Sequence, residues 1–343
     1  MFLIYIIFSL ILLHVINFTL KKNNILVYKS FGFSHKEKKR DKIILSGGLF
    51  FVISFFFISL LNNFTYLNFV LYGSVFLILG FFSDRNLKIS AQQRLAIMLI
   101  LSFLIIINAQ LFIDKVDIVF LDKFLKINIL SIIFFAVCLV ILINGVNFID
   151  GTNGNAIGYF IICFISLIYQ LGFFENTQNE LKTLKIMLCP MIAFFLLNLF
   201  NKNYLGDNGS YLMASVTGIL CINCFIYYNI SSFYFINLLL YPVFEVLVSF
   251  IRKIQSNKSP YSPDNLHLHH LIEKNLSQFK LLKKYKNNLS TFVILFLLTI
   301  FFVLINLNIN DKLFQLNLTS VFCIFYLFIY LILRILLSSK KLR

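Results

Sequence analysis

The chain has 343 residues, of which 59% are hydrophobic and only 13% are charged. A soluble domain carries about 25% charged residues, so this composition excludes a chain that hides its apolar surface in one aqueous core, and lipid must be its solvent. Nucleic-acid-binding proteins can also have a formal net charge as high as +16, but here the basic residues alternate with long apolar runs. We therefore expect an integral membrane protein with no nucleic-acid partner.

Eleven apolar runs follow one another along the chain, each near the ~20 residues that a spanning helix needs. Backbone exposed to lipid must form its hydrogen bonds within the segment, so the runs predict helices rather than open sheet. The first run has neither the charged start nor the cleavage site of a secretory signal, and we expect it to be retained. Cys221 and Cys224 lie inside one run and are expected to pack as small apolar residues rather than to serve redox or zinc chemistry. The runs are 2–20, 43–61, 64–82, 95–113, 127–143, 156–174, 184–200, 211–230, 233–251, 289–306 and 313–337.

The predicted fold class is all-α integral membrane, with about eleven transmembrane helices in one polytopic domain, residues 1–343. Lys and Arg stay on the cytosolic side during membrane insertion. With the N-terminus outside and the C-terminus cytosolic, the cytosolic segments hold 24 of the 30 Lys and Arg, which favours that orientation. These segments are 21–42, 83–94, 144–155, 201–210, 252–288 and the tail from residue 334.

Four of the cytosolic segments carry unusual polar residues. Asp84, Asp150 and Asp207 each lie at a predicted helix end, flanked by Asn or Gly. A helix cap or a partner for Lys explains any one of them, but an acidic residue at membrane depth is also a functional candidate. Three such residues on the same face of the membrane favour a shared site. The segments are Gly80–Arg94, Asn144–Asn155, Asn198–Ser210 and Ser259–His270.

The residue types in these segments fit phosphoryl transfer. Carboxylate and amide oxygens suit Mg²⁺, which is usually held by one or two carboxylates together with substrate phosphates. Arg94 lies where a helix is predicted to begin, and its guanidinium and the helix-start amides could meet a phosphate. Anchoring at lipid headgroups is the alternative for Arg94. Phosphoryl transfer depends mostly on positioning and charge neutralisation, which these parts can supply.

The histidines His267, His269 and His270 form a cluster just after two prolines. A zinc site is one interpretation, but the sequence supplies no convincing further ligands. Donation to phosphate or sugar hydroxyls is another, because a histidine can donate from either ring nitrogen. A solvated polar loop is the third, and the prolines favour a shaped loop over it.

These segments resemble the signatures of the polyprenyl-phosphate N-acetylhexosamine-1-phosphate transferases, the WecA and MraY superfamily in glycosyltransferase family 4. Asn144–Gly151 is similar to the second family signature, and Gly206–Ser210 is similar to the third. Ser259–His270 resembles the signature of the WecA-like branch and differs from the MraY histidine motif. Gly47 and Gly48 resemble a further short motif. The resemblance covers residues 40–272 with the signatures in the family's order.

The resemblance implies transfer of a HexNAc-1-phosphate from a UDP-N-acetylhexosamine, such as UDP-GlcNAc, to undecaprenyl phosphate, with release of UMP. It implies Mg²⁺, with Mn²⁺ as a substitute, a bacterial inner membrane and an active site facing the cytoplasm. The product would initiate a lipid-linked envelope glycan such as O-antigen or capsule, and a homodimer stays open. The implied roles are catalytic for Asp84, Asp150 and Asp207, metal-binding for Asn147 and Asp207, and substrate-binding for Arg94, Asn144, Asn153, His267, His269 and His270.

Two positions depart from the family pattern. Ser83 stands where an Asp-Asp pair is usual, so one carboxylate is missing beside Asp84. Asn153 replaces an Asp that is common in WecA-like members, and an Asn cannot act as a base. Two other functions therefore stay open: a catalytically impaired relative or scaffold, and a transporter. Transporters place polar groups near the bilayer midplane, and Glu245 is the main acidic residue inside a predicted helix.

Overall fold

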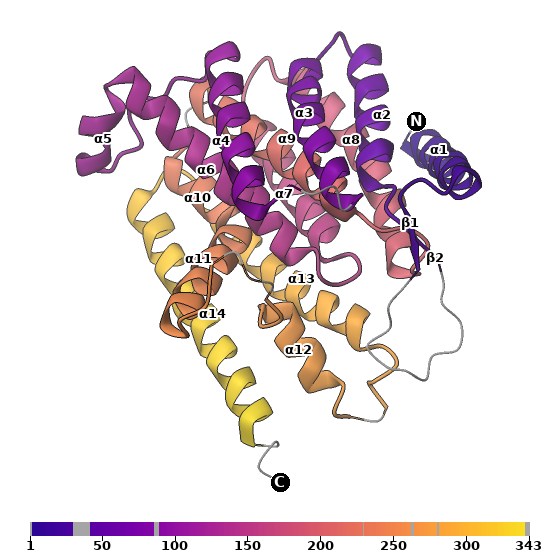
Figure 1. The fold of residues 1–343 in the computed structure, drawn as a ribbon. Helices are drawn as coiled ribbons and strands as arrows, with labels where there is room; N and C mark the ends of the chain where they lie inside the picture. The colour runs from indigo at the N-terminus through magenta and orange to yellow at the C-terminus, as the bar shows by residue number, and fades with distance from the viewer. Residues whose placement is uncertain are drawn as a thin grey trace. The chain divides into compact units, whose positions relative to one another are not determined.

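The computed structural model describes residues 2–29, 42–85, 89–228, 230–260, 262, 264–279 and 281–339. The described chain is almost entirely helical (Figure 1), and its short strands β1 (Val27–Lys29) and β2 (Lys42–Ile44) pair antiparallel. The helices are α1 (Phe2–Asn23), α2 (Gly47–Leu61), α3 (Leu67–Asp84), α4 (Ala91–Asn108), α5 (Val119–Leu125), α6 (Asn128–Ile149), α7 (Asn155–Leu171), α8 (Gln178–Leu199), α9 (Gly206–Tyr227), α10 (Ser232–Leu238), α11 (Leu240–Gln255), α12 (Leu268–Leu276), α13 (Lys286–Ile305) and α14 (Lys312–Ser339).

The apolar runs of the sequence coincide with helices. Ten of the eleven each overlap one helix, and the run 233–251 overlaps the pair α10 and α11. Within the described residues, seven helices are long and apolar enough to cross a membrane, or eight if α10 and α11 count as one span. The all-α membrane class is therefore confirmed. The count of eleven spans and the sides of the termini stay predictions.

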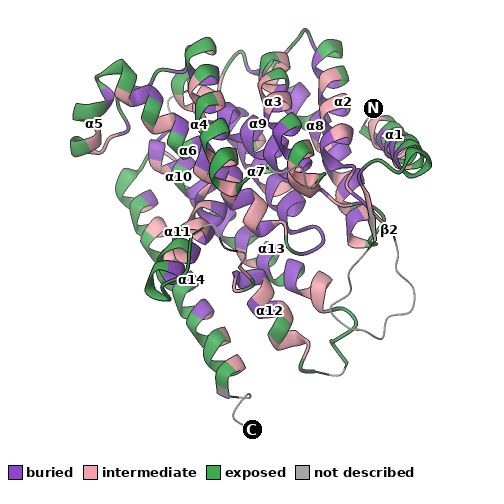
Figure 2. Cartoon of the chain, viewed as in Figure 1, coloured by how far each residue is buried: buried purple, intermediate pink, exposed green. Residues whose placement is uncertain are grey.

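The exposed surface is apolar where lipid would contact it. Only 11% of the membrane-crossing stretch of α14 is buried, whereas 78% of that of α9 is buried. In Figure 2, α14 and α1 are largely green and α9 is largely purple. Large side chains such as Ile324 and Ile335 lie on the exposed surface of α14. A surface of this kind is stable in hydrocarbon and costly in water, which supports a multi-pass membrane protein.

Contacts divide the chain into two compact units. The first unit comprises residues 1–89 and 167–216. In it, α2 packs against α3 and α8, and α1 packs against α8. The second unit comprises residues 90–166 and 217–343. In it, α6 packs against α4 and α11, and α12 packs against α13 and α14. The prediction of a single polytopic domain stays a prediction.

The ninth predicted span is a broken helix. Helix α10 ends at Leu238 and α11 begins at Leu240, with a bend of 68° between them. Pro242 explains the break, because proline has no N–H to donate and its ring clashes with the carbonyl four residues earlier, that of Leu238. An apolar run reports burial in lipid but not such a break.

Two further differences concern the start of one helix and the presence of another. Helix α4 begins at Ala91, four residues before the predicted run, because Ser90 and Gln93 form a capping box. Gln93 donates its backbone N–H to the Ser90 hydroxyl (3.2 Å), and Ser90 donates its N–H to the Gln93 side chain (2.9 Å). The segment 252–288, predicted as a loop, contains the short helix α12.

Candidate functional site

In the first unit, α2 and α9 begin side by side. Leu45 and Tyr204 form an isolated parallel bridge just before the two helices. Tyr204 donates its N–H to the carbonyl of Ile44 (2.9 Å), and Gly47 donates its N–H to the carbonyl of Tyr204 (3.2 Å). Two helix N-termini therefore meet at one place, each with a positive dipole end and with first-turn N–H groups that must find partners outside their own helix.

Asp84, at the C-terminal end of α3, contacts the start of α9. Its carboxylate accepts the backbone N–H groups of Asp207 (3.0 Å) and Asn208 (3.0 Å), and also the side-chain amide of Asn208. The side-chain oxygen Oδ1 of Asn208 in turn accepts the N–H of Gly48 (2.7 Å). A Cβ at Gly80 would overlap the backbone of Asp207 and Asn208, so only glycine lets α3 approach α9 this closely.

Asp207, the other acidic site residue predicted in the first unit, lies in the first turn of α9 and is partly buried. Its carboxylate accepts a hydrogen bond of 2.5 Å from the hydroxyl of Ser83, the residue before Asp84. The Asp207 carbonyl also accepts the hydroxyl of Ser210 (3.2 Å). Asp84 thus holds the backbone of Asp207, and Ser83 holds its carboxylate.

In the second unit, α13 holds the segment that follows Asp150. Asp150 is the C-terminal cap of α6 and is partly buried. Asn153 donates its N–H to the side chain of Asn287 (2.8 Å), and its carbonyl accepts the hydroxyl of Thr291 (2.7 Å). The side-chain amide of Asn155 donates to the carbonyl of Ile149, 2.8 Å away. The turn between α6 and α7 is therefore fixed at both ends.

The histidines lie on the N-terminal end of α12, beside that turn. His267 is its N-cap, and His269 and His270 lie in its first turn. The ring centroids of His269 and His270 are 4.0 Å apart, and Nε2 of His269 lies against Gly151, where a Cβ would overlap it. The structure thus brings the Asp150–Asn153 segment and the predicted histidine cluster together.

One face of α11 holds the chain that leads to the histidines. The buried carboxylate of Glu245 lies 3.0 Å from Nδ1 of His267 and accepts the N–H of Leu268 (3.1 Å). One turn further, Ser249 donates to the carboxylate of Asp264 (2.6 Å), which also pairs with Arg252. Glu245 therefore supports the histidine segment. It is 1% exposed, so it does not offer the water-filled path that a transport function would need.

The imidazole ring of His269 is buried. It is 0% exposed, and neither ring nitrogen has a partner among the described residues. Burial, followed by the neighbouring histidines, keeps the pKa of His269 well below the usual value. Burial, followed by His267, lowers the pKa of His270 to about 4. Both rings are therefore neutral at pH 7, and each can donate one N–H and accept one hydrogen bond.

The remaining predicted residues also lie in the second unit. Arg94 is in the first turn of α4 and is partly buried. Asn144 is directed along α6, where its amide donates to the carbonyl of Val140 (2.8 Å) and lies 3.6 Å from the sulfur of Met98. Asn147 lies one turn after Asn144 on the same helix. The pairing of Asn147 with Asp207 at one metal stays a prediction.

The residues around Asp207 fit a magnesium ion by their chemistry. They offer hard oxygen atoms from a carboxylate and a hydroxyl, beside the positive ends of two helices, where an anionic ligand is favoured. Mg²⁺ typically keeps several waters and uses one or two carboxylates together with substrate phosphates. Among the residues that the structure describes, no three His, Cys, Asp or Glu side chains gather as a complete ligand set. Asp207 therefore fits a metal that a phosphate substrate would share.

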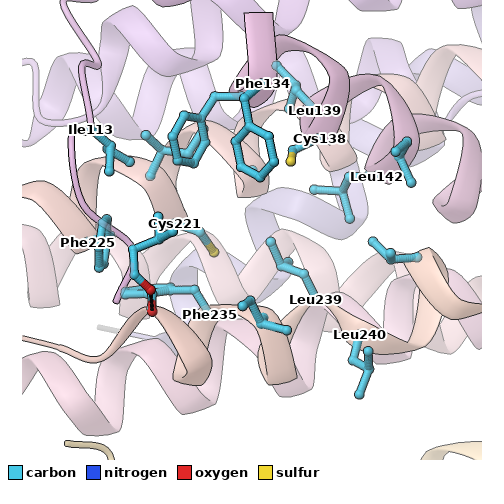
Figure 3. Close-up of a pocket in the computed structure, with 18 of the residues that line it drawn as sticks. Ile113, Phe134, Cys138, Leu139, Leu142, Cys221, Phe225, Phe235, Leu239 and Leu240 are labelled. Carbon is cyan, nitrogen blue, oxygen red and sulfur yellow. Dashed lines mark hydrogen bonds between the residues drawn. The ribbon is translucent and has the colours of Figure 1, made fainter. Parts of the chain in front are cut away.

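An apolar cavity of about 260 Å³ lies in the second unit, lined by α6, the later part of α9, α10 and α11. Figure 3 shows Cys221 in its wall among Phe134, Phe225 and Phe235. Cys221 and Cys224 are both buried free thiols. They therefore pack as small apolar residues, as predicted.

Sequence reasoning missed several residues that build these sites. Asn208 links Asp84 to Gly48, and Arg252 pairs with Asp264 beneath the histidines. The signal available for Asn208 was its place inside the Gly206–Ser210 motif. For Arg252, a weak signal was its position seven residues after Glu245, which puts both on one face of a helix.

Comparison with known proteins identifies related sequences. Residues 66–225 match the family model described as Glycosyl transferase family 4. The chain is 27% identical over 203 residues to the undecaprenyl-phosphate alpha-N-acetylglucosaminyl 1-phosphate transferase of Thermotoga maritima, covering 59% of this chain and 60% of that protein. It is 27% identical over 152 residues to the decaprenyl-phosphate N-acetylglucosaminephosphotransferase of Mycobacterium leprae, covering 38% of each.

A third relative has a different name. The chain is 26% identical over 202 residues to the phospho-N-acetylmuramoyl-pentapeptide-transferase of Petrotoga mobilis, covering 54% of this chain and 61% of that protein. In all three relatives, the matched part is less than two thirds of the relative's length.

Proposed function

Because residues 66–225 place the chain in glycosyl transferase family 4, we propose that it transfers an N-acetylhexosamine 1-phosphate from a UDP-sugar to a polyprenyl phosphate. An oxygen of the acceptor phosphate would bond to the sugar-bearing phosphorus, and the bond from that phosphorus to the bridging oxygen would break. That oxygen and its electron pair would leave with UMP. The observation that carries the proposal is Asp207, held by Ser83 and Asp84 at the start of α9.

Asp207 would hold Mg²⁺, with Mn²⁺ as a substitute. When bound, the ion would neutralise the charge of the diphosphate and of the leaving UMP. Asp84 would keep the first turn of α9 in place, so that the Asp207 carboxylate faces the substrate in a fixed orientation. Phosphoryl transfer depends on such positioning, because the protein does little covalent chemistry itself.

The second unit would bind the sugar nucleotide. The ring N–H of neutral His269 has no partner among the residues that the structure describes, and buried polar groups are normally paired. A phosphate oxygen or a sugar hydroxyl would satisfy it. Asp150, Asn153 and Arg94 would contribute further contacts, with Asp150 as the catalytic acid that the family resemblance implies.

We also propose a biological setting for this activity. The bias of Lys and Arg supports a multi-pass protein of a bacterial inner membrane with the site facing the cytoplasm, where UDP-sugars are available. UDP-GlcNAc or a related UDP-amino sugar would be the donor and undecaprenyl phosphate the acceptor. The product would begin a lipid-linked envelope glycan such as O-antigen or capsule. We also propose that a homodimer is compatible with this activity.

The test is the production of UMP by isolated membranes. Membranes containing the protein are incubated with Mg²⁺, undecaprenyl phosphate and a panel of UDP-N-acetylhexosamines, and the lipid product is identified by mass. We expect one UDP-sugar to give UMP and a HexNAc-diphosphate lipid. Asp207→Asn should reduce the rate by about 10²–10³-fold or more while the protein still inserts, since it removes a fixed charge at the reacting phosphates.

Asp114→Asn is the matched control, because Asp114 is exposed and lies far along the chain from every predicted site residue. Normal turnover by Asp207→Asn would contradict the assigned role of this carboxylate. No product with any UDP-sugar would instead favour the impaired relative or scaffold that Ser83 suggested. Chelation with EDTA should stop the reaction, and added Mn²⁺ should restore it.

A further inference from the structure

Ser83 occupies a place where the family pattern has an acid, and the structure shows what the hydroxyl does there. The Ser83 Oγ lies 2.5 Å from the Asp207 carboxylate, the separation of a short hydrogen bond to a charged acceptor. A serine hydroxyl has one proton and a carboxylate has none, so Ser83 donates. The contact therefore attracts Asp207, whereas a carboxylate at position 83 would repel it.

Asp84 holds the backbone of Asp207, whereas Ser83 holds its carboxylate. Both oxygens of the Asp84 carboxylate accept hydrogen bonds from the first turn of α9, through Asp207 and Asn208. Asp84 thus fixes where Asp207 starts, but none of these bonds reaches the Asp207 side chain. Two adjacent residues at the end of α3 consequently hold backbone and side chain of the same aspartate.

We propose that Ser83 is a positioning residue for Asp207, which orients the carboxylate that receives a divalent cation and leaves the site one negative charge short of an acidic pair. This rests on the proposed function, because the cation is the one that the diphosphate substrate would share. Hydrogen-bond partners that orient a ligating carboxylate typically change metal affinity or activity by 10–100-fold when removed. Replacing serine with an acid would add charge that attracts a cation and, without a cation, repels Asp207.

The experiment measures Mn²⁺ binding directly, with purified full-length protein in lipid nanodiscs and the spin resonance signal of free Mn²⁺. Ser83→Ala should weaken Mn²⁺ binding about tenfold and lower kcat, with little change in KM for the lipid acceptor. Ser83→Thr keeps a hydroxyl and should stay within about threefold of the original Mn²⁺ affinity. Ser83→Asp should bind Mn²⁺ about tenfold more tightly, and its Tm should fall without cation and recover with Mn²⁺.

Ser74→Ala is the matched control, because Ser74 lies on the same helix, is partly buried, and among the described residues donates only to the Leu71 carbonyl of its own helix. Unchanged Mn²⁺ affinity in Ser83→Ala, or a Tm of Ser83→Asp that ignores Mn²⁺, would overturn the proposal. If Ser83→Ala does not fold, the Thr and Asp variants still decide the question. Mn²⁺ binding that depends on Ser83 and Asp207 without any UMP release would sink the proposed function while leaving this inference intact.

Discussion

Asp84 accepts hydrogen bonds from N–H groups in the first turn of α9, and these are among the donors that a helix leaves without internal partners. A carboxylate at a helix N-terminus is also favoured by the dipole. The two explanations that the sequence left open for this residue, a cap and a site residue, are therefore compatible. Here the cap comes from a different helix, 123 residues earlier in the chain than Asp207.

The partner of such a residue cannot be predicted from local sequence. Asp84 and Asp207 were recognisable as polar residues at the ends of apolar runs, and both lie at helix ends in the structure. Asn208 was not singled out, because its contacts with Gly48 and Asp84 are made across 160 and 124 residues. Sequence periodicity reports which face of one helix is buried, but not which distant helix covers it.

The histidines of α12 should make stability fall in mild acid. The pKa of His270 is lowered to about 4 by burial and by His267, with opposing effects from Glu273 and Glu245 and a further lowering from Lys274. An unfolded histidine has a pKa near ~6.5, so between pH 4 and 6.5 the unfolded state binds more protons. The free energy of unfolding therefore decreases as pH falls through this window and is unaffected by His270 above it.

The measurement is the Tm between pH 7.5 and 4.5. Other acid-sensitive groups also contribute, so the informative quantity is the difference between variants. His270→Gln should lose less Tm than the original protein over this range. His14→Gln, an exposed histidine on α1, is the control and should follow the original curve. Identical curves for all three proteins would show that His270 titrates alike in the folded and unfolded states.

At the scale of elements, α11 supports the segment that carries the histidines. Its residues Glu245, Ser249 and Arg252 recur at intervals of three and four, so they lie on one face and contact residues 264–268. The sequence predicted an apolar span here and a shaped loop after it. It did not show that Pro242 divides the span, or that the second half is amphipathic enough to hold the loop.

The pair of Arg252 and Asp264 should keep this loop closed. Both side chains are about 90% buried, and removing one partner of such a pair leaves an uncompensated charge, which costs about 3–5 kcal/mol. Asp264→Asn should therefore increase cleavage by trypsin after Lys258, an exposed residue of the same loop. The rate of that cleavage, followed by mass, is the measurement.

The double variant Arg252→Met with Asp264→Leu removes both charges. Trypsin should cleave it more slowly than it cleaves Asp264→Asn. Asp311→Asn is the control, because Asp311 is exposed and caps the N-terminal end of α14, whereas Arg252 contacts that helix at Tyr330. Equal cleavage rates in Asp264→Asn and the original protein would mean that the pair does not hold the loop.

At the scale of the whole molecule, the Lys and Arg count predicts which side of the membrane each loop faces. Lys258 belongs to a segment predicted to be cytosolic, and Lys123 to a segment predicted to be outside; both are exposed. In intact bacterial spheroplasts, Lys123→Cys should react with an impermeant maleimide, and Lys258→Cys should react only after permeabilisation. Cys138, the exposed native thiol, is first replaced by Ala to remove background.

The opposite labelling pattern would reverse the orientation, and labelling of both sites in intact cells would refute the predicted alternation of loops. The composition and the length of the apolar runs were enough for the all-α membrane class, because lipid accepts so much apolar surface and runs of ~20 residues span it as helices. The sequence did not predict that the helices group into two compact units. That grouping depends on contacts between helices far apart in the chain, such as α1 with α8.

The bonds between Asp84 and the start of α9 also set an order of events during synthesis. The ribosome must add 124 residues after Asp84 before Asn208 exists. At about 5–20 residues per second, this takes about 6–25 s. During that time α2 and α3 have been synthesised, but the first turn of α9, which bonds to both, has not. A nascent chain arrested before Tyr204 would therefore keep the Asp84 carboxylate in water or bound to another partner. Any insertase or chaperone that shields a polar helix end would act on this chain in that interval.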